Sequence, residues 1–229
     1  MATPEEMADL VSAIDALLNL SATQQLLQLN SNTCERAYEA YVLSLCMETV
    51  RRAGGTAALR GILSGSNPNP IVFRGAPGSM ASTNQDFSYV SCSLRTRRFE
   101  IHVDVEYQGT SSVLHEIDVS LCDEAHCRVA RQTGGTPKAE GGKLLMAFEC
   151  KFYENTPGVS LGRTFVGLVA DCGGLRMKAF VANMQSQNLR RYFSKSSRPE
   201  PFLGLIPADS ASEERFIRNV EQELLRWAP

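Results

Sequence analysis

Residues 144–153 place two opposite charges, Glu149 and Lys151, inside an otherwise apolar run. Removing a charge from water is costly unless the charge is paired, so such residues need a partner. Residues two apart on a strand share a face. Glu149 and Lys151 are therefore predicted to project together, while the even-numbered residues of the run hold the strand in the core. The pattern predicts a charged site at the rim of a buried strand.

A second apolar segment with embedded acids, 113–121, carries Glu116 and Asp118 on one face. If this segment is a strand beside 144–153, Asp118 and Glu149 can meet. Two carboxylates alone would repel each other, whereas a divalent cation between them removes that penalty. A lysine beside the ion can orient or deprotonate a water, or offset charge on a phosphate. Asp118, Glu149 and Lys151 thus form a minimal site for metal-assisted phosphodiester hydrolysis.

Asp118, followed farther along the chain by Glu149-Cys150-Lys151, resembles the motif of the PD-(D/E)xK nuclease superfamily. The core of that superfamily runs helix, three strands, helix, strand, and this chain follows the order from about 33 to 184. The resemblance implies that Asp118 and Glu149 bind Mg²⁺ (or Mn²⁺) and that Lys151 supports the attacking water, so that these three residues are catalytic. One departure is that Ile117 precedes Asp118, where the superfamily often has proline.

Further metal ligands are expected near this motif. Members of the superfamily often add an acid from the first core helix, for which Glu39 and Glu35 are both candidates here. Glu116 shares a face with Asp118 and is a candidate ligand or outer acid. The simpler alternative is a structural ion-pair cluster at a strand end, with Glu39 on a solvated helix flank.

The elements that must position these residues follow an α/β order. Apolar residues recur at helical spacing in two N-terminal segments, the second of which ends at Gly54-Gly55. The later elements are predicted as strands 87–94, 98–109, 113–121, 144–153, 175–184 and 201–207, and helices 160–171, 186–195 and 210 onward. We expect a restriction-endonuclease-like core with a central mixed β-sheet flanked by helices, plus extra N- and C-terminal helices. Residues 1–30 would be a helical extension and 31–229 the nuclease-like domain.

Two further segments carry explicit expectations. In 98–109, Ile101, Val103 and Val105 are expected to face the core. The intervening polar residues are expected on a wet face: Glu100, His102, Asp104 and Glu106. His102 and Asp104 could resemble an acid–base pair, but a wet strand face makes them ordinary surface residues. The glycine-rich stretch 122–143 is expected to be a flexible loop or a long hairpin.

Basic residues suggest where nucleic acid would bind, because lysine and arginine supply most phosphate contacts. The predicted nucleic-acid-binding residues are Arg190, Arg191 and Lys195 in the basic helix, and Arg131 and Lys138 in the 122–143 loop. The net charge of −2 argues against strong non-specific binding to polyanions but allows a local basic groove. A solvated basic surface is an equally simple interpretation of any one of these residues.

The seven cysteines indicate a reducing compartment. Their number is odd and most lie in apolar patterns, which favours buried free thiols in the cytoplasm. Cys122, His126 and Cys127 lie close together, but no second ligand pair follows at zinc spacing. The sequence shows no Gly-x-Ser-x-Gly elbow, no signal peptide and no apolar run long enough for a transmembrane helix.

These observations predict a magnesium-dependent endonuclease that acts on DNA rather than RNA, without a membrane partner. A homodimer would allow both strands to be cut. A role in bacterial defence or DNA processing follows by analogy of fold alone. The alternative is a catalytically inactive nuclease-fold module that binds nucleic acid or a protein partner.

Overall fold

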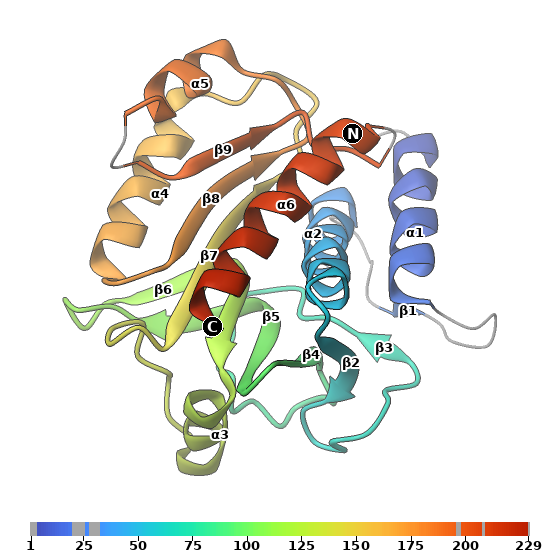
Figure 1. Cartoon of the computed structure of the whole chain (residues 1–229), viewed down its shortest axis with the longest axis vertical. Helices are drawn as coiled ribbons and strands as arrows, with labels where there is room; N and C mark the ends of the chain where they lie inside the picture. Colours follow the sequence, from blue (N-terminus) through green and yellow to red (C-terminus); the bar gives the residue numbers. More distant parts are fainter. Residues whose placement is uncertain (1–3, 20–25, 28–32, 196–197, 208, 229) are drawn as a thin grey trace.

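A computed structural model of the chain describes residues 4–19, 26–27, 33–195, 198–207 and 209–228 (Figure 1). The elements in chain order are α1 Pro4–Leu18, β1 Leu26–Leu27, α2 Thr33–Arg52, β2 Thr56–Gly61, β3 Ile71–Val72, β4 Ser88–Leu94, β5 Arg97–Gln108, β6 Leu114–Asp123, α3 Glu124–Thr133, β7 Leu144–Lys151, α4 Val159–Asp171, β8 Met177–Ala182, α5 Gln187–Phe193, β9 Glu200–Leu203 and α6 Ser210–Trp227.

The main sheet has seven strands in the order β2-β4-β5-β6-β7-β8-β9. Neighbouring strands are antiparallel from β2 to β7, whereas β7, β8 and β9 run parallel to one another. β1 and β3 form a separate two-stranded parallel pair. The expected α/β class with a central mixed sheet and flanking helices is therefore confirmed.

Helices cover both faces of this sheet (Figure 1). Side chains of α1, α2 and α6 share one buried cluster with one face, and those of α3, α4 and α5 share a second cluster with the other. Leu10, Ile14 and Leu18 of α1 belong to the same core as Tyr38 of α2 and Phe216 of α6. The described helix of the expected 1–30 extension thus packs into the main core; residues 1–3, 20–25 and 28–30 of that extension lie outside the described residues.

β7 follows the alternation expected for it. Phe148, Cys150 and Phe152 are buried in the core on the α2 side. Phe148 packs edge-on against Phe216 at 5.6 Å, and Phe152 packs against Tyr38 at the same centroid separation. These aromatic contacts fix which face of β7 is turned to the core, so Glu149 and Lys151 are turned away from it.

The expectation of a wet face on β5 is wrong. Glu100, His102 and Asp104 are only 2%, 2% and 1% exposed, respectively. Each is covered by a partner from another element: Arg131 of α3 binds Glu100, the Tyr89 ring stacks on His102, and Arg36 of α2 binds Asp104. Alternating polar residues thus mark buried ion pairs here, because helices pack over both faces of the strand.

The expectation that Val103 and Val105 share one face is also wrong. Val103 belongs to the core beneath α2, whereas Val105 belongs to the core beneath α3–α5. Asp104 between them has a φ of 50°, in the left-handed region. That conformation interrupts the alternation of a strand, and aspartate tolerates it better than most residues do.

Part of the expected flexible loop 122–143 is a helix. Asp123 caps α3 by accepting a hydrogen bond from the His126 amide at 3.1 Å, and Gly134 ends the helix with a φ of 68°. Cys127 and Ala130 are its buried residues and anchor it to the sheet. The glycines and polar residues that suggested a loop follow the helix. Among the described residues, no helix combines the length and apolar character needed to cross a membrane.

Candidate functional site: an acidic fork between two strands

The site lies where β6 and β7 separate. The two strands are paired up to Val119 opposite Phe148, which confirms that they are neighbours. Beyond that pair, β6 stays with β5 as far as Leu114, and β7 stays with β8 as far as Lys151. We call the space between the diverging strands the fork. Asp118 is the first residue of β6 beyond the last pair, and Glu149 the first of β7.

Asp118, Glu149 and Lys151 meet in the fork. The Lys151 ammonium donates to Asp118 Oδ2 at 2.9 Å and lies 2.9 Å from Glu149 Oε1. Asp118 Oδ2 also accepts a hydrogen bond from the Cys150 amide at 2.8 Å. The carboxylate of Asp118 thus takes the place of a strand partner for β7. The two charges in the apolar run are tolerated because Lys151 forms ion pairs with both Glu149 and Asp118.

The electrostatics of this trio reflect burial and mutual contact. Burial and then the neighbouring Asp118 raise the pKa of Glu149, Lys151 opposes the rise, and the resulting pKa is about 7. Burial alone would lower the pKa of Lys151, but Asp118 and Glu149 outweigh it and the pKa is raised. Lys151 is therefore held in its charged form, while Glu149 can exchange a proton near neutral pH.

Helix α2 contributes Glu39 to the fork. Glu39 is 6% exposed, whereas Glu35, one turn earlier, is exposed to solvent, so the structure selects Glu39 of the two candidates. Arg36 lies between the helix and the strands: it donates to Asp104 and is 3.6 Å from Glu39 Oε2. Burial, and then Asp104 and Asp118, raise the pKa of Glu39 to about 10.

Asp104 joins this site, although the alternation of its strand predicted a solvent-exposed position. Val103 pairs with Val119 and Val105 with Ile117, so Asp104 and Asp118 lie between the same two pairs, and a carboxylate oxygen of each lies within 4.8 Å of the other. Its Oδ1 atom is buried without a hydrogen-bond partner, as is Glu39 Oε2. Burial raises the pKa of Asp104 to about 7, with Arg36 opposing that rise. The sequence did contain one signal for this role: Asp104 lies on the strand that forms a hairpin with the strand of Asp118.

Glu39, Asp104 and Asp118 suit a hard divalent cation. One ligand atom from each lies within 4.8 Å of the others, and all three residues are buried. Carboxylate oxygens are the ligands that Mg²⁺ and Mn²⁺ prefer, and two of these oxygens lack a partner. Glu116 borders the group: burial and then Asp118 raise its pKa. The predicted ligands Asp118, Glu39, Glu116 and Glu149 therefore gather around the fork.

A second buried group contains Glu100, His102 and Cys127, with one ligand atom from each within 4.8 Å of the others. Both oxygens of Glu100 accept hydrogen bonds from Arg131 at 2.6 Å, and His102 Nε2 lies 2.8 Å from Glu100. These contacts commit Glu100 to an internal ion pair. They also place the guanidinium of Arg131, one of the predicted nucleic-acid contacts, against the body of the protein. His126, near Cys127 in the sequence, contacts the Lys138 carbonyl instead.

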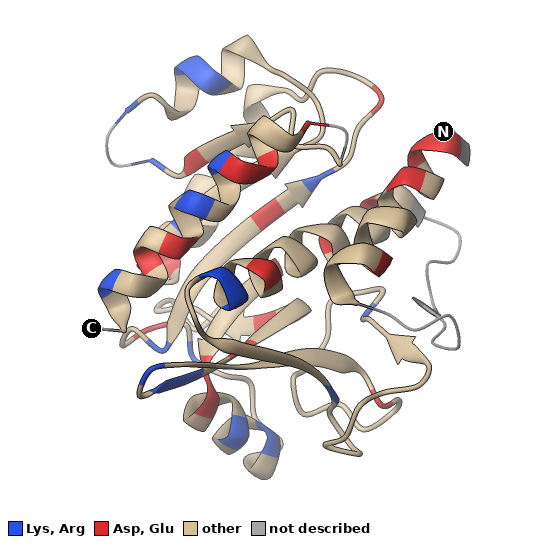
Figure 2. Cartoon of the chain, turned by 45° about the vertical axis from the view of Figure 1, so that its right-hand side comes forward, with Lys and Arg blue, Asp and Glu red and all other residues tan. Residues whose placement is uncertain are grey.

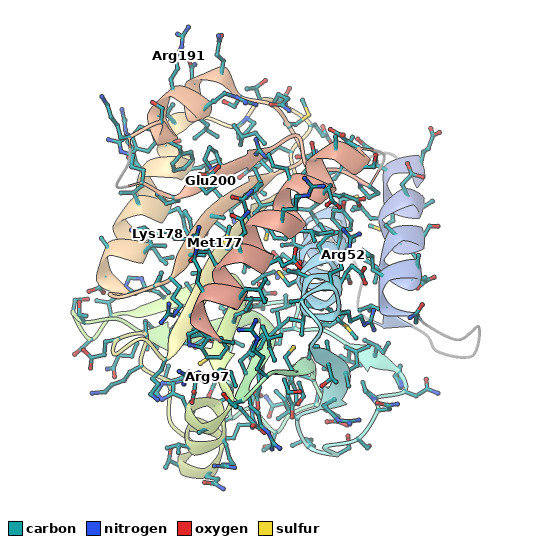
Figure 3. The ribbon with its side chains drawn as sticks, viewed as in Figure 1. Arg52, Arg97, Met177, Lys178, Arg191 and Glu200 are labelled. Carbon is teal, nitrogen blue, oxygen red and sulfur yellow. The ribbon has the colours of Figure 1, made fainter. Side chains whose placement is uncertain are left out.

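The other predicted nucleic-acid contacts are exposed. Arg190, Arg191 and Lys195 lie on α5 and just after it, on the opposite face of the sheet from α2. Figure 3 shows Arg191 pointing away from the molecule. Arg190 and Lys195 line a hollow of about 350 Å³ that also includes Arg198 and Arg215. Lys138 is exposed and is 3.6 Å from Glu140.

His115 has a structural role. Its ring lies 2.6 Å from Asp171, which also accepts hydrogen bonds from Thr110 and Ser111. These contacts tie the turn between β5 and β6 to the end of α4.

Comparisons of this chain with protein-family models, with curated proteins and with solved structures find no match.

Proposed function

We propose that this chain is a divalent-metal-dependent nuclease that hydrolyses phosphodiester bonds of DNA. The observation that carries the proposal is the position of Lys151, 2.9 Å from both Asp118 and Glu149 and beside buried carboxylates with unpartnered oxygens. Mg²⁺ or Mn²⁺ bound there would neutralise charge on the phosphate and activate a water. Asp118, Glu39 and Asp104 would hold the ion, with Glu116 and Glu149 at its border.

The other residues of the fork have different proposed roles in catalysis. Because the pKa of Lys151 is raised, its ammonium stays charged and can offset the charge that develops on the phosphate. Glu149, whose pKa is raised to about 7, is suited to take a proton from the attacking water. Arg36 holds Asp104 in place from α2. These assignments give lysine an electrostatic role and glutamate the role of base.

The alternative is a module with this fold that binds nucleic acid or a protein without cutting. Lys151 favours it in one respect, since its ammonium already satisfies one oxygen each of Asp118 and Glu149 without any metal. A chain that had lost activity could retain such an internal ion pair for stability. The two functions differ in whether the carboxylates of the fork bind a metal and support turnover.

The deciding experiment incubates the protein with supercoiled plasmid, single-stranded DNA and RNA, each with Mg²⁺ or Mn²⁺. Asp118→Asn and Lys151→Met are the test variants, and Glu35→Gln is the matched control on the exposed side of α2. Asparagine at 118 retains an acceptor for the Cys150 amide and so limits the effect on folding. We expect metal-dependent cutting of DNA by the wild type and the control, and a loss of about 100-fold or more in the variants.

Wild-type protein that cuts no substrate with either metal, or variants that cut as well as the wild type, would refute the nuclease proposal.

We also propose that the protein is cytoplasmic, which agrees with seven free, buried thiols, and that it cuts duplex DNA as a homodimer. Sedimentation with and without duplex tests the dimer. A role in bacterial defence or DNA processing is the context we propose.

A further inference from the structure

A hollow of about 670 Å³ lies beside the fork, bounded by the loop that precedes β4. Its lining comes from residues 74–79 and from Glu106 of β5, together with Ser82, Asn84, Gln85 and Phe87. The wall is rich in small and neutral polar residues, including Ser79, Ser82 and Asn84. A volume of this size is within the range of small-molecule sites. Nothing in the proposed catalytic chemistry uses this hollow.

The loop is fixed to β5 next to Asp104. The Gly78 amide donates to the Asp104 carbonyl at 3.2 Å, and the Glu106 amide donates to the Gly78 carbonyl at 3.1 Å. Glu106, which lines the hollow, lies opposite Glu116 of β6. The hollow and the fork are therefore adjacent along one hairpin.

Arg74 lines the hollow and carries a positive charge that the protein leaves incompletely matched. It is 6% exposed, and its Nη2 atom is buried without a hydrogen-bond partner. Its guanidinium stacks on the Phe87 ring at 4.3 Å, and within the described part of the chain no carboxylate forms an ion pair with it. Burial lowers its pKa, and Asp104 is near enough to oppose that shift. A buried charge of this kind is costly unless an anion approaches it.

Gly78 keeps the loop close to this charge. A Cβ at that position would lie 3.0 Å from Arg74 Nη1, closer than a side chain ordinarily packs. Glycine therefore lets the backbone of the loop lie directly against the guanidinium. A planar guanidinium supported on an aromatic ring and bordered by neutral hydrogen-bonding groups is suited to a phosphate oxyanion.

We propose that this hollow binds one backbone phosphate of the nucleic acid whose neighbouring bond the fork would cut, with Arg74 supplying the charge. This inference rests on the proposed function for the identity of the ligand. Glu106 at the inner edge carries a negative charge towards the fork, so the phosphate sits on the side of the hollow formed by the loop. The hollow thus positions the substrate and takes no part in the reaction itself.

The test measures binding of a fluorescent single-stranded DNA oligonucleotide in EDTA, so that no cutting occurs. Ser82→Asp adds a negative charge to the wall of the hollow, and Thr83→Asp adds the same charge to an exposed neighbour that does not line it. We expect Ser82→Asp to weaken binding by about tenfold or more and Thr83→Asp to change it by less than about twofold. Equal effects of the two variants, or none from Ser82→Asp, would overturn the inference.

A second measurement identifies the contact as a single phosphate. Oligonucleotides with one neutral methylphosphonate at successive positions should show one position that weakens wild-type binding and leaves Ser82→Asp binding unchanged. Additive losses at every position would contradict a discrete phosphate site. Arg74→Gln should lower the salt slope of binding by about one unit. Ser82→Asp keeps the test valid if Arg74→Gln does not fold.

Two further comparisons are needed. The first distinguishes free phosphate from a phosphate of nucleic acid, and the second distinguishes failure of the phosphate site from failure of the nuclease proposal. Inorganic phosphate is added as a competitor of the oligonucleotide. If it competes at low millimolar concentration and no methylphosphonate position weakens binding, the hollow binds free phosphate and the proposed nucleic-acid contact is overturned. If wild-type protein binds as expected but never cuts with Mg²⁺ or Mn²⁺, the nuclease proposal fails and the phosphate site stands. If it cuts DNA but Ser82→Asp binds normally, only the phosphate site fails.

Discussion

Asp104 and Asp118 lie between the same two residue pairs of β5 and β6 and bring carboxylate oxygens within 4.8 Å of each other, although like charges this close repel. The protein balances them with one cation on each side: Arg36 contacts Asp104 and Lys151 contacts Asp118. Figure 2 shows acidic and basic positions on the strands and helices near the middle of the molecule. The remaining negative charge, with Glu39 close by, is the part of the fork that a metal would neutralise.

Replacing Lys151 with methionine should destabilise the metal-free protein. Asp118 and Glu149 would lose their shared partner while remaining largely buried, at 9% and 15% side-chain exposure, which we expect to cost about 3 kcal/mol. Mn²⁺ should restore part of the loss, because the ion takes over the role of counter-charge. Thermal unfolding in EDTA and in Mn²⁺ measures both effects.

The control is Lys143→Met, at an exposed lysine just before β7. It should leave the unfolding temperature nearly unchanged under both conditions. An unfolding temperature for Lys151→Met in EDTA equal to that of the wild type would show that the fork does not depend on this ammonium.

Glu39→Gln should separate stability from metal binding. Glu39 is buried and its pKa is raised to about 10, so it must be carried as the neutral acid in the folded metal-free protein at pH 7. Glutamine removes that cost and should raise the free energy of unfolding by about 3 kcal/mol. The same change removes a ligand and should weaken Mn²⁺ binding by about tenfold or more.

Urea denaturation and isothermal titration with Mn²⁺ measure these two quantities. Glu35→Gln, on the exposed flank of α2, should alter neither. A Glu39→Gln protein that is less stable and still binds Mn²⁺ normally would remove Glu39 from the metal site.

Asp104 can be tested through its backbone. With a φ of 50°, this position favours asparagine and disfavours β-branched residues. Asp104→Val should be less stable than Asp104→Asn by at least about 1–2 kcal/mol, the ordinary cost of the left-handed conformation. Both variants lose the charge that pairs with Arg36, but asparagine keeps an acceptor for it, so their difference in urea denaturation sets an upper bound on the backbone effect. Equal stabilities would mean that the strand can relax to an extended conformation here.

The sequence predicted the fork because its signals are local. Alternation of apolar residues in 144–153 fixed the face of Glu149 and Lys151, and strand order placed Asp118 next to them. Asp104 could not be predicted in the same way, since its role depends on a left-handed φ and on register with β6. The burial of Glu100 and His102 depends on Arg131 and Tyr89, which lie elsewhere in the sequence.

Other parts of the fold show the same limit. The sequence predicts a loop in place of α3 because residues 134–142 contain several glycines, although Asp123 provides an N-cap and Cys127 and Ala130 provide a buried stripe. The choice of Glu39 over Glu35 required the orientation of α2 against the sheet, which the helical period alone does not specify. Contacts between distant elements decided each of these cases.

Acid should destabilise the ion pair beneath α3. Burial would raise the pKa of Glu100, but hydrogen bonds from Arg131 and His102 outweigh it and lower the pKa to about 2. A lowered carboxyl pKa contributes stability that is present above pH 4.5 and is lost as the pH falls towards 2; here that amounts to about 3 kcal/mol. Burial also lowers the pKa of His102. The unfolded chain therefore takes up a proton at this histidine below pH 6.5 before the folded protein does, which also reduces stability in acid.

Unfolding free energies of the wild type and Glu100→Gln between pH 7 and pH 3 check this prediction. The variant should be less stable at pH 7 and should show a shallower decline with acid. Parallel pH curves for the two proteins would assign the acid sensitivity to other groups. Arg163→Gln, at an exposed arginine of α4, is a suitable control for a change in charge alone.

All seven cysteines are free thiols buried in the folded chain, and they are distributed among α2, β4, β6, α3, β7 and the end of α4. A small alkylating reagent would therefore react with each thiol only when that element opens. The order in which the cysteines are modified, read by mass spectrometry, would map which layers of the protein separate first. The chain in this way carries its own set of probes for local unfolding, without any engineered label.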